Sequence, residues 1–240
     1  MNLLNRTRQV IAACMLLLLC TVSHVRAQDE VPDYLIEVVI FETLAGQSLG
    51  AGGLYYPRVE NSLRLGSEAA VAQGFISVEQ NLQLSENAAA IAASSRYRLL
   101  RHISWRQPGL DENEAKAVRV ALGEAIPMFL PDDLRSYEEF FPGSTNLLPD
   151  YPKSINTTTV NGTIKVRLGR FLHMEARLAY TDESTGQSFR LAQSRKMRSG
   201  ELHYIDNPRF GILTKITPLE DKFGTANVDE SADGVVTAPQ

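Results

Sequence analysis

The segment Arg195–Asp206, RKMRSGELHYID, predicts a tight β-hairpin that joins a basic strand to an acidic, aromatic one. Three of its first four residues are cations, and a Ser-Gly pair, which favours a turn, follows them. Glu, His, Tyr and Asp then return on the second strand. Strand alternation places Arg195 on one face with Met197, and Lys196 on the other face with Arg198.

Outward from this segment, the last third of the chain predicts an antiparallel meander of about five strands. Asn161-Gly162, between two Thr-rich and Val-rich runs, is a strong signal for a two-residue hairpin turn. The returning strand runs from Thr163 to about Tyr180, with a bulge or bend at Gly169. The remaining strands are expected over Ser188–Met197, Glu201–Asp206 and Arg209–Thr217, with turns at Asp182–Gln187, Ser199-Gly200 and Asn207-Pro208.

The first part of the chain combines strands with helices. Asp33–Glu42 is rich in Ile and Val and predicts a buried strand. Ser77–Ser94 opens with the spacing of a capping box and continues with apolar residues at helical spacing, which predicts one or two helices. Strands are also expected over Arg96–Trp105 and Lys116–Leu122, followed by a loop-rich excursion over 123–156 with a short helix around Asp133–Phe140.

These elements indicate an α+β fold, with N-terminal helices packed on a mainly antiparallel sheet and a C-terminal β-meander. The strand–helix–strand unit over 33–42, 77–94 and 96–105 resembles half of a ferredoxin-like split. In that arrangement Trp105 shares a sheet with the C-terminal strands, and the two basic segments of the chain, residues 96–107 and 195–198, come together.

The N-terminus has the pattern of an export signal. Arg6 and Arg8 precede the apolar run Val10–Val22, and Val25-Arg26-Ala27 fits a cleavage site. We expect cleavage after Ala27 and a periplasmic protein with no transmembrane segment in its mature chain. An uncleaved anchor and a lipoprotein are the alternatives.

The predicted domain organisation is a signal peptide over 1–27, one α+β domain over 28–218 and a disordered acidic tail over 219–240. Both cysteines lie inside the signal, so the mature chain is expected to have no disulfide and no thiol nucleophile. About 213 residues are enough to bury a core without such cross-links.

Charge is segregated along the chain. Residues 160–215 contain ten Lys and Arg against five Asp and Glu, whereas residues 109–141 contain three against eight. Loss of the signal shifts the formal net charge from −4 to −7, because the signal holds three Arg and no acid. This balance disfavours nucleic acid as a partner, but it leaves one locally basic surface.

Enzymatic chemistry has little support in the sequence. The nucleophile elbow, the P-loop and the dinucleotide fingerprint are absent from it, and no cofactor is expected. His173 and Glu175, and likewise Glu201 and His203, are two residues apart and so share strand faces, which would suit a metal if the two strands were neighbours. A surface ladder of ion pairs is the simpler interpretation, and a metal site is not predicted.

The cations and aromatic residues predict a site for an anionic ligand. Arginine binds carboxylates with two parallel hydrogen bonds, and an aromatic face stacks on a sugar or a peptide. A solvated hairpin whose cations pair with Glu201 and Asp206 is the alternative. The candidate ligand-binding residues are Arg195, Lys196, Arg198, Glu201, His203, Tyr204, Trp105, Arg106, Arg170 and His173.

Four stretches resemble the CsiV family of periplasmic peptidoglycan-binding, cell-shape integrity proteins of Gram-negative bacteria. They are Tyr34–Glu42 (YLIEVVIFE), Tyr97–Pro108 (YRLLRHISWRQP), Gly169–Leu178 (GRFLHMEARL) and Gln193–Leu213 (QSRKMRSGELHYIDNPRFGIL). The chain departs from the family pattern at Asn207, where His is more common, and at Lys196, where Arg is more common.

The resemblance implies a non-enzymatic envelope protein that binds peptidoglycan and supports wall synthesis and cell shape. It further implies a peptidoglycan synthase, or the activator of one, as a protein partner. Two alternatives remain: a periplasmic interaction protein that does not bind the wall, and a hydrolase acting on the wall.

Overall fold

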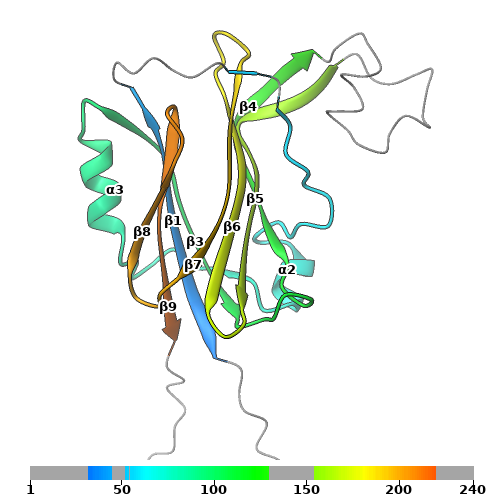
Figure 1. The fold of residues 1–240 in the computed structure, drawn as a ribbon, viewed down its shortest axis with the longest axis vertical. Coiled ribbons are helices and arrows are strands. Elements are labelled where there is room, and N and C mark those ends of the chain that lie inside the picture. Colours follow the sequence, from blue (N-terminus) through cyan, green and yellow to red (C-terminus); the bar gives the residue numbers. More distant parts are fainter. Residues whose placement is uncertain (1–31, 45–51, 54, 130–153, 220–240) are drawn as a thin grey trace, which may run out of the picture. The chain divides into compact units, whose positions relative to one another are not determined.

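Nine strands in two antiparallel sheets dominate the computed structural model, which describes residues 32–44, 52–53, 55–129 and 154–219 (Figure 1). All of these residues belong to one unit, Val31–Gln240. Strands account for 57% and helices for 8% of the structure. The fold is therefore a β-fold.

The first sheet, sheet A, has the strand order β2-β3-β1-β9-β8. Its central strand β1 pairs antiparallel with β3 on one side and β9 on the other. The first residue of β1, Asp33, is opposite Pro108 of β3 and Leu219 of β9. The strands are β1 (Asp33–Thr43), β2 (Ile76–Ser77), β3 (Tyr97–Pro108), β8 (Leu202–Asp206) and β9 (Phe210–Leu219).

The second sheet, sheet B, has the strand order β4-β5-β6-β7, so each strand pairs with its sequence neighbour. Long strands and short turns give this meander: residues 169–171 join β5 to β6, and residues 182–187 join β6 to β7. The strands are β4 (Ala117–Phe129), β5 (Ser154–Leu168), β6 (Leu172–Thr181) and β7 (Ser188–Met197).

The main core lies between the two sheets. Alternate residues of β1 point into it, among them Ile36, Val38 and Ile40, all with no exposed surface. Sheet B contributes residues such as Ile164 and Met174, which are equally buried. The inner faces of both sheets thus exclude water from one continuous apolar layer.

A smaller core covers the outer face of sheet A. Val39 of β1 packs there against Leu84, which precedes helix α3 (Ser85–Ala92), and against Ala88 within that helix. The carboxylate of Glu37 accepts hydrogen bonds from the backbone amides of Gln83 and Leu84, at 2.9 and 3.0 Å. A buried strand residue therefore anchors the segment that leads into α3. The other helix, α2 (Glu68–Ala72), has five residues.

The predicted α+β class is wrong, because a second sheet, and not a layer of helices, packs against sheet A to form the main core. Within 77–94 the helix is confined to Ser85–Ala92, and before it Asn81 adopts a left-handed φ of 57° that interrupts helical geometry. The ferredoxin-like comparison is also wrong. Its crossover needs parallel strands, whereas β1 and β3 are direct antiparallel neighbours.

The predicted hairpin over Arg195–Asp206 is wrong as well. Its first strand, β7, belongs to sheet B and its second, β8, belongs to sheet A. Residues 198–201 therefore carry the chain from one sheet to the other, and the amide of Gly200 donates to the carbonyl of Ile216 in β9 at 2.8 Å. Trp105 does share sheet A with β8 and β9, but the basic residues of β7 lie in sheet B.

The predicted turn at Asn161-Gly162 is replaced by the middle of β5. Strands β4 and β6 pair with β5 on both sides, with Val120 and Leu178 opposite Gly162. Gly162 has a φ of 146°, and a Cβ there would lie 2.0 Å from the carbonyl oxygen of Arg177. The glycine thus permits a close approach of two strands rather than a turn.

Several other elements match the sequence predictions. The strands predicted near 33–42, 96–105, 188–197, 201–206 and 209–217 are present, with small differences at their ends. The strand predicted over 116–122 is also present, but β4 continues to Phe129, where we predicted a loop. The turns at 182–187 and 207–208 are also present, whereas the bend predicted at Gly169 is a full hairpin turn. The signal peptide, the helix around Asp133–Phe140 and the acidic tail beyond Leu219 lie outside the described residues.

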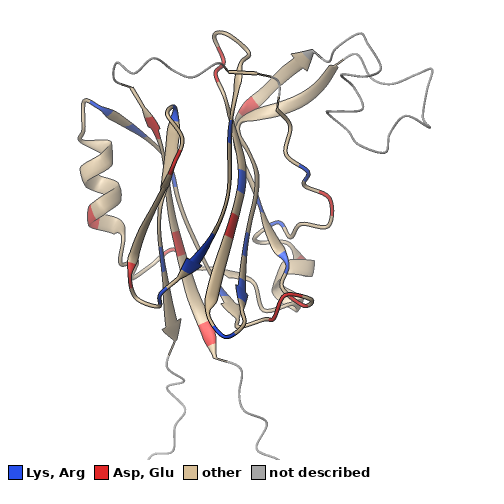
Figure 2. Cartoon of the chain, viewed as in Figure 1, with Lys and Arg blue, Asp and Glu red and all other residues tan. Residues whose placement is uncertain are grey.

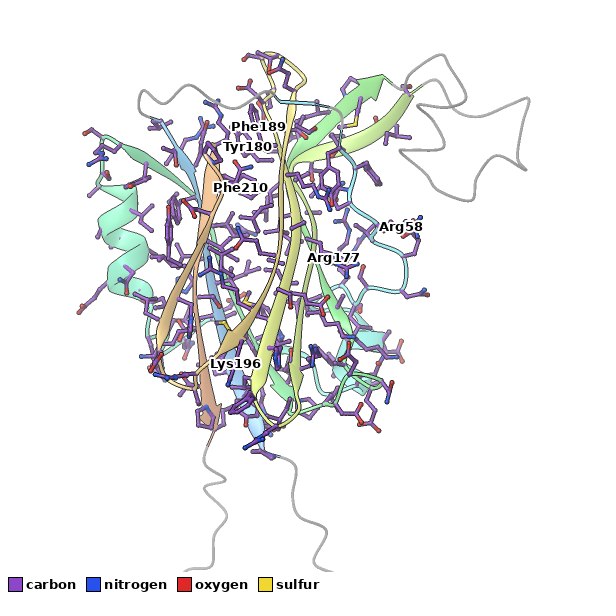
Figure 3. All side chains as sticks on the ribbon, viewed as in Figure 1. Arg58, Arg177, Tyr180, Phe189, Lys196 and Phe210 are labelled. Carbon is purple, nitrogen blue, oxygen red and sulfur yellow. The ribbon has the colours of Figure 1, made fainter. Side chains whose placement is uncertain are left out.

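Arg209 links the two sheets at one end of the core. Its guanidinium contacts Glu42 of β1 at 3.0 Å and Asp182, just after β6, at 2.6 Å. The rings of Tyr180 and Phe189 flank it, with centroids 5.5 and 6.0 Å from the guanidinium carbon (Figure 3). Burial and the nearby Glu42 raise the pKa of Tyr180 to about 12.

Replacing Gly162 with Ala is expected to destabilise the fold by about 2–3 kcal/mol, because the new methyl group overlaps the β6 backbone. Urea unfolding measures the change. Gly186→Ala is the matched control, since Gly186 also has a positive φ, of 69°, but a Cβ added there would meet no atom within 4 Å. The control should cost about 1 kcal/mol. An equal loss of unfolding free energy in the two variants would contradict the close approach of β5 and β6 at Gly162.

Asp182→Asn is expected to destabilise the protein at neutral pH and to have little effect in acid. Hydrogen bonds from Ser184 and the charge of Arg209 lower the pKa of Asp182 below its ordinary 3.8. Ionised Asp182 therefore stabilises the fold above that pH, and the contribution is lost as the pH falls through the lowered pKa. Unfolding free energies between pH 7 and pH 2.5 measure this. A difference between the two proteins that stays constant with pH would contradict it.

Candidate functional site

The outer face of sheet B is covered in one part and open in another. Gly53 bridges to Ser188 at the β7 edge and Leu63 bridges to Val118 at the β4 edge, so the intervening chain passes from one edge of the sheet to the other. Asn161 and Ala179, which point outward from the sheet, are 1% and 0% exposed. The half of the face toward the β5–β6 turn is more open to solvent.

A row of nitrogen-bearing side chains crosses this open half. Arg167 of β5 is directly opposite His173 of β6, which is directly opposite Lys196 of β7. Strand alternation places all three on the outer face, since Val166, Met174 and Met197 are buried in the core. Figure 2 shows Lys and Arg segments at the end of β7 and at the β5–β6 turn.

The turn adds an aromatic ring and a further cation to the row. The ammonium nitrogen of Lys196 lies 3.0 Å from the centroid of the Phe171 ring, and the guanidinium carbon of Arg170 lies 5.5 Å from it. The Nδ1 atom of His173 is 3.1 Å from the carbonyl oxygen of Phe171. Since that oxygen only accepts, Nδ1 carries the proton and Nε2 faces away from the turn. We call Arg167, Arg170, Phe171, His173 and Lys196 the basic corner.

Acidic groups neutralise only part of the basic corner. Arg167 contacts Glu112 at 3.1 Å and Glu175 at 3.9 Å, and Glu175 also pairs with Arg177 at 3.2 Å. Within the described residues, Lys196 and Arg170 form no ion pair. Two cations are therefore exposed beside a ring with no acid to balance them.

The remaining predicted residues of the 195–204 segment lie around the link between the sheets. Arg195 points to the opposite face of β7 from Lys196, where it donates to the side chain of Gln193 at 3.2 and 3.3 Å. Arg198 pairs with Glu201 at 3.4 Å, and its backbone amide donates to Nε2 of His203 at 3.3 Å. Arg195 thus lies behind the basic corner, on the other face of β7, whereas Arg198, Glu201 and His203 contact one another in and beside the link.

Tyr204 and Arg106 lie on the outer face of sheet A, away from the basic corner. Tyr204 stacks on Phe41 with a centroid distance of 6.0 Å and an interplanar angle of 11°. Burial, together with Asp206, raises the pKa of Tyr204 to about 12. Arg106 pairs with Asp33 on the same sheet. The structure therefore does not bring these two residues together with Lys196.

Trp105 belongs to the core and offers no surface to a ligand. It is 0% exposed, and its indole nitrogen donates to Gln107 at 2.9 Å. The side-chain amide of Gln107 in turn donates to the carbonyl of Val166 in sheet B at 3.2 Å. The expectation that Trp105 contacts a ligand is wrong, because its strand position points between the two sheets.

Sequence reasoning missed Arg167 and Phe171. The signal for Phe171 was a large apolar residue that alternation placed with His173, Glu175 and Arg177 on the polar side of the strand. An aromatic residue among charges on a solvated face indicates a functional surface or a packing partner. Arg167 carried no such local signal, since only the β5–β6 register reveals it opposite His173.

The two His-Glu pairs do not form a metal centre. His173 and Glu175 lie in β6 of sheet B, whereas His203 lies in β8 of sheet A and Glu201 just precedes it. In the part of the chain that the structure describes, no group of three or more His, Cys, Asp or Glu side chains is placed to hold a metal ion.

The profile of one protein family, described as "Peptidoglycan-binding protein, CsiV", matches residues 55–219, which is more than half of the chain. The chain belongs to the CsiV family. The match includes the whole basic corner, both basic segments and every strand except β1. No curated protein and no solved structure matches the chain. Among the described helices of this CsiV protein, none is long and apolar enough to span a membrane.

The contact between Lys196 and Phe171 predicts a measurable coupling. In a double-mutant cycle of Lys196→Gln and Phe171→Leu, the coupling free energy should be about 0.5–1 kcal/mol in favour of the native pair. Urea unfolding of the four proteins measures it. Lys165→Gln replaces Lys196→Gln in the control cycle, because Lys165 instead donates to the carbonyl of Glu112. A coupling no larger than that of the control would refute a stabilising contact.

Proposed function

We propose that this chain binds peptidoglycan without catalysing a reaction on it, and that the basic corner is the contact surface. Family membership supports the ligand. The observation that supports the surface is the pair of unbalanced cations, Lys196 and Arg170, around the exposed ring of Phe171. Arg198 lies just beyond the same end of β7, where Glu201 pairs with it, and Arg195 lies on the opposite face of that strand.

The arrangement favours binding over hydrolysis of the wall. A glycosidase needs two carboxyl groups that flank one bond. The acids next to the basic corner are Glu112 and Glu175, and arginines pair with both. Both carboxylates are therefore engaged by arginine side chains, which is typical of structural ion pairs on a protein surface.

We further propose that the protein acts in the periplasm, after removal of residues 1–27, as one domain over 28–218 followed by an acidic tail. The charged start, apolar run and cleavage pattern of the first 27 residues support export. A wall ligand is also consistent with that location.

The proposed role in the cell is to support wall synthesis and cell shape as a regulator of a peptidoglycan synthase, through the synthase or its activator. A second candidate, protein contact without wall binding, is favoured by the edge strand β8. Its side chains Leu202 and Tyr204 are 50% and 46% exposed on the same face of sheet A. Exposed apolar residues on a sheet edge are typical of protein interfaces.

Co-sedimentation with insoluble peptidoglycan sacculi tests the proposed function. The wild-type chain should pellet with sacculi and release no soluble wall fragments. Arg170→Ala/Lys196→Ala should weaken binding about tenfold or more, because it removes two charged contacts.

The matched control is Arg96→Ala/Arg101→Ala, which removes two exposed cations, one just before β3 and one within it. It should pellet like wild type. Both variants should unfold cooperatively, and the corner variant should lose no more than about 1 kcal/mol of stability with the Lys196–Phe171 contact. Absence of wild-type protein from the pellet would reject direct wall binding in favour of the protein-contact candidate. Release of soluble fragments would reject the non-enzymatic role.

A further inference from the structure

The side chains of the basic corner suit one part of the proposed peptidoglycan ligand, the stem peptides, better than the other part, the glycan. Peptidoglycan consists of a glycan of uncharged N-acetylated sugar units and of stem peptides that carry free carboxylates. Proteins bind sugar rings by stacking them on open aromatic faces, and they bind carboxylates with arginine and lysine. The two kinds of ligand therefore need different surfaces.

The aromatic ring of the corner is poorly suited to stacking on a sugar. The ammonium group of Lys196 lies 3.0 Å from its centroid and so occupies one face, and the guanidinium of Arg170 is near the ring as well. The ring attracts these cations and restricts their motion. Phe171 thus positions the cations rather than offering itself to a ligand.

The row leaves positive charge that the described acids do not balance. Arg167, His173 and Lys196 lie opposite one another on three successive strands, and the nearest acid on β6, Glu175, lies at the next outward position, where arginines pair with it. Lys196 and Arg170 have no ion-pair partner among the described residues. An anionic ligand would balance these two charges.

The dimensions of the row fit a short peptide with more than one carboxylate. Neighbouring strands are roughly 5 Å apart, so the row spans roughly 10 Å from β5 to β7. Carboxylates two or three residues apart on an extended peptide are separated by roughly 7–10 Å. His173 lies between the two ends of the row and adds a hydrogen-bonding nitrogen.

From these contacts we infer that the basic corner recognises the carboxylates of the wall's stem peptides, and not the sugars of its glycan. Arg167 and Arg170 bind carboxylate oxygens from the β5 side, Lys196 binds from the β7 side, and His173 contacts the peptide between them. This inference rests on the proposed wall binding and specifies which part of the wall is bound.

Chemical modification of sacculi tests the inference on insoluble material. One batch is acetylated to block its amines, and a second is acetylated and then amidated to neutralise its carboxylates. The glycan and the cross-links are the same in both. The full chain should bind acetylated sacculi as well as untreated ones, and amidation should weaken its binding about tenfold or more. Binding to the acetylated batch should also weaken as salt rises from about 50 to about 500 mM.

Charge-reversal variants locate the surface. Arg170→Glu/Lys196→Glu should lose binding to acetylated sacculi, whereas Arg96→Glu/Arg101→Glu, which has the same net charge, should retain it. Unfolding midpoints near that of wild type show that both variants fold. Lys196→Arg, which keeps the charge, should bind within about threefold of wild type.

The outcomes separate the inference from the proposed function. Loss of binding on amidation, together with loss in the corner variant alone, supports stem carboxylates as the ligand. Equal binding to both batches overturns the inference while wall binding stands, and equal loss in both charge-reversal variants overturns the assignment to this corner. No binding to untreated sacculi overturns the proposed function and the inference with it.

Discussion

Burial of β1 on both faces is the constraint on which the rest of this structure depends. One face supplies Ile36, Val38 and Ile40 to the layer between the sheets, and the other supplies Val39 to the contact with α3. A strand buried on both sides leaves no room for unpaired polar groups. Its two buried acids are accordingly engaged: Glu37 binds the amides of Gln83 and Leu84 just before α3, and Glu42 pairs with Arg98 and Arg209.

The second sheet has the opposite character, because only one of its faces meets the core. Its outer face carries charged and hydroxyl side chains and is partly covered by the chain that passes from Gly53 to Leu63. The basic corner lies where that cover ends. The core and the proposed binding surface thus lie on different faces of the same strands, as Met197, which is buried, and its neighbour Lys196, which is exposed, illustrate.

Local patterns predicted the strands well and their partners poorly. Alternation and turn residues are properties of neighbouring positions, so Ser188–Met197 was predicted with its correct bounds. Sheet membership depends on distant contacts, such as that of Gly200 with Ile216, which no short segment contains. The same limit explains why Gly162 was taken for a turn residue, since its role depends on the backbone of Arg177 on the next strand. It also explains why Lys196 was predicted as a candidate ligand-binding residue and Arg167 was not, since only the β5–β6 register places Arg167 opposite His173. Trp105 was misplaced because composition does not say which face of a strand is buried.

The register of β1 has a practical consequence for handling the protein. Asp33, the first residue of β1, lies opposite Pro108 and also opposite Leu219, the last residue of β9. The chain therefore enters and leaves the described fold at the same end of sheet A. The amide of Gly109 bonds to Pro32, and that of Leu168 bonds to Leu110, which brings the β5–β6 turn to the same end (Figure 1). A purification tag or fluorescent fusion joined close to either end would therefore crowd the basic corner. An insertion in the Asp182–Gln187 turn, at the far end of β6, would leave that surface clear.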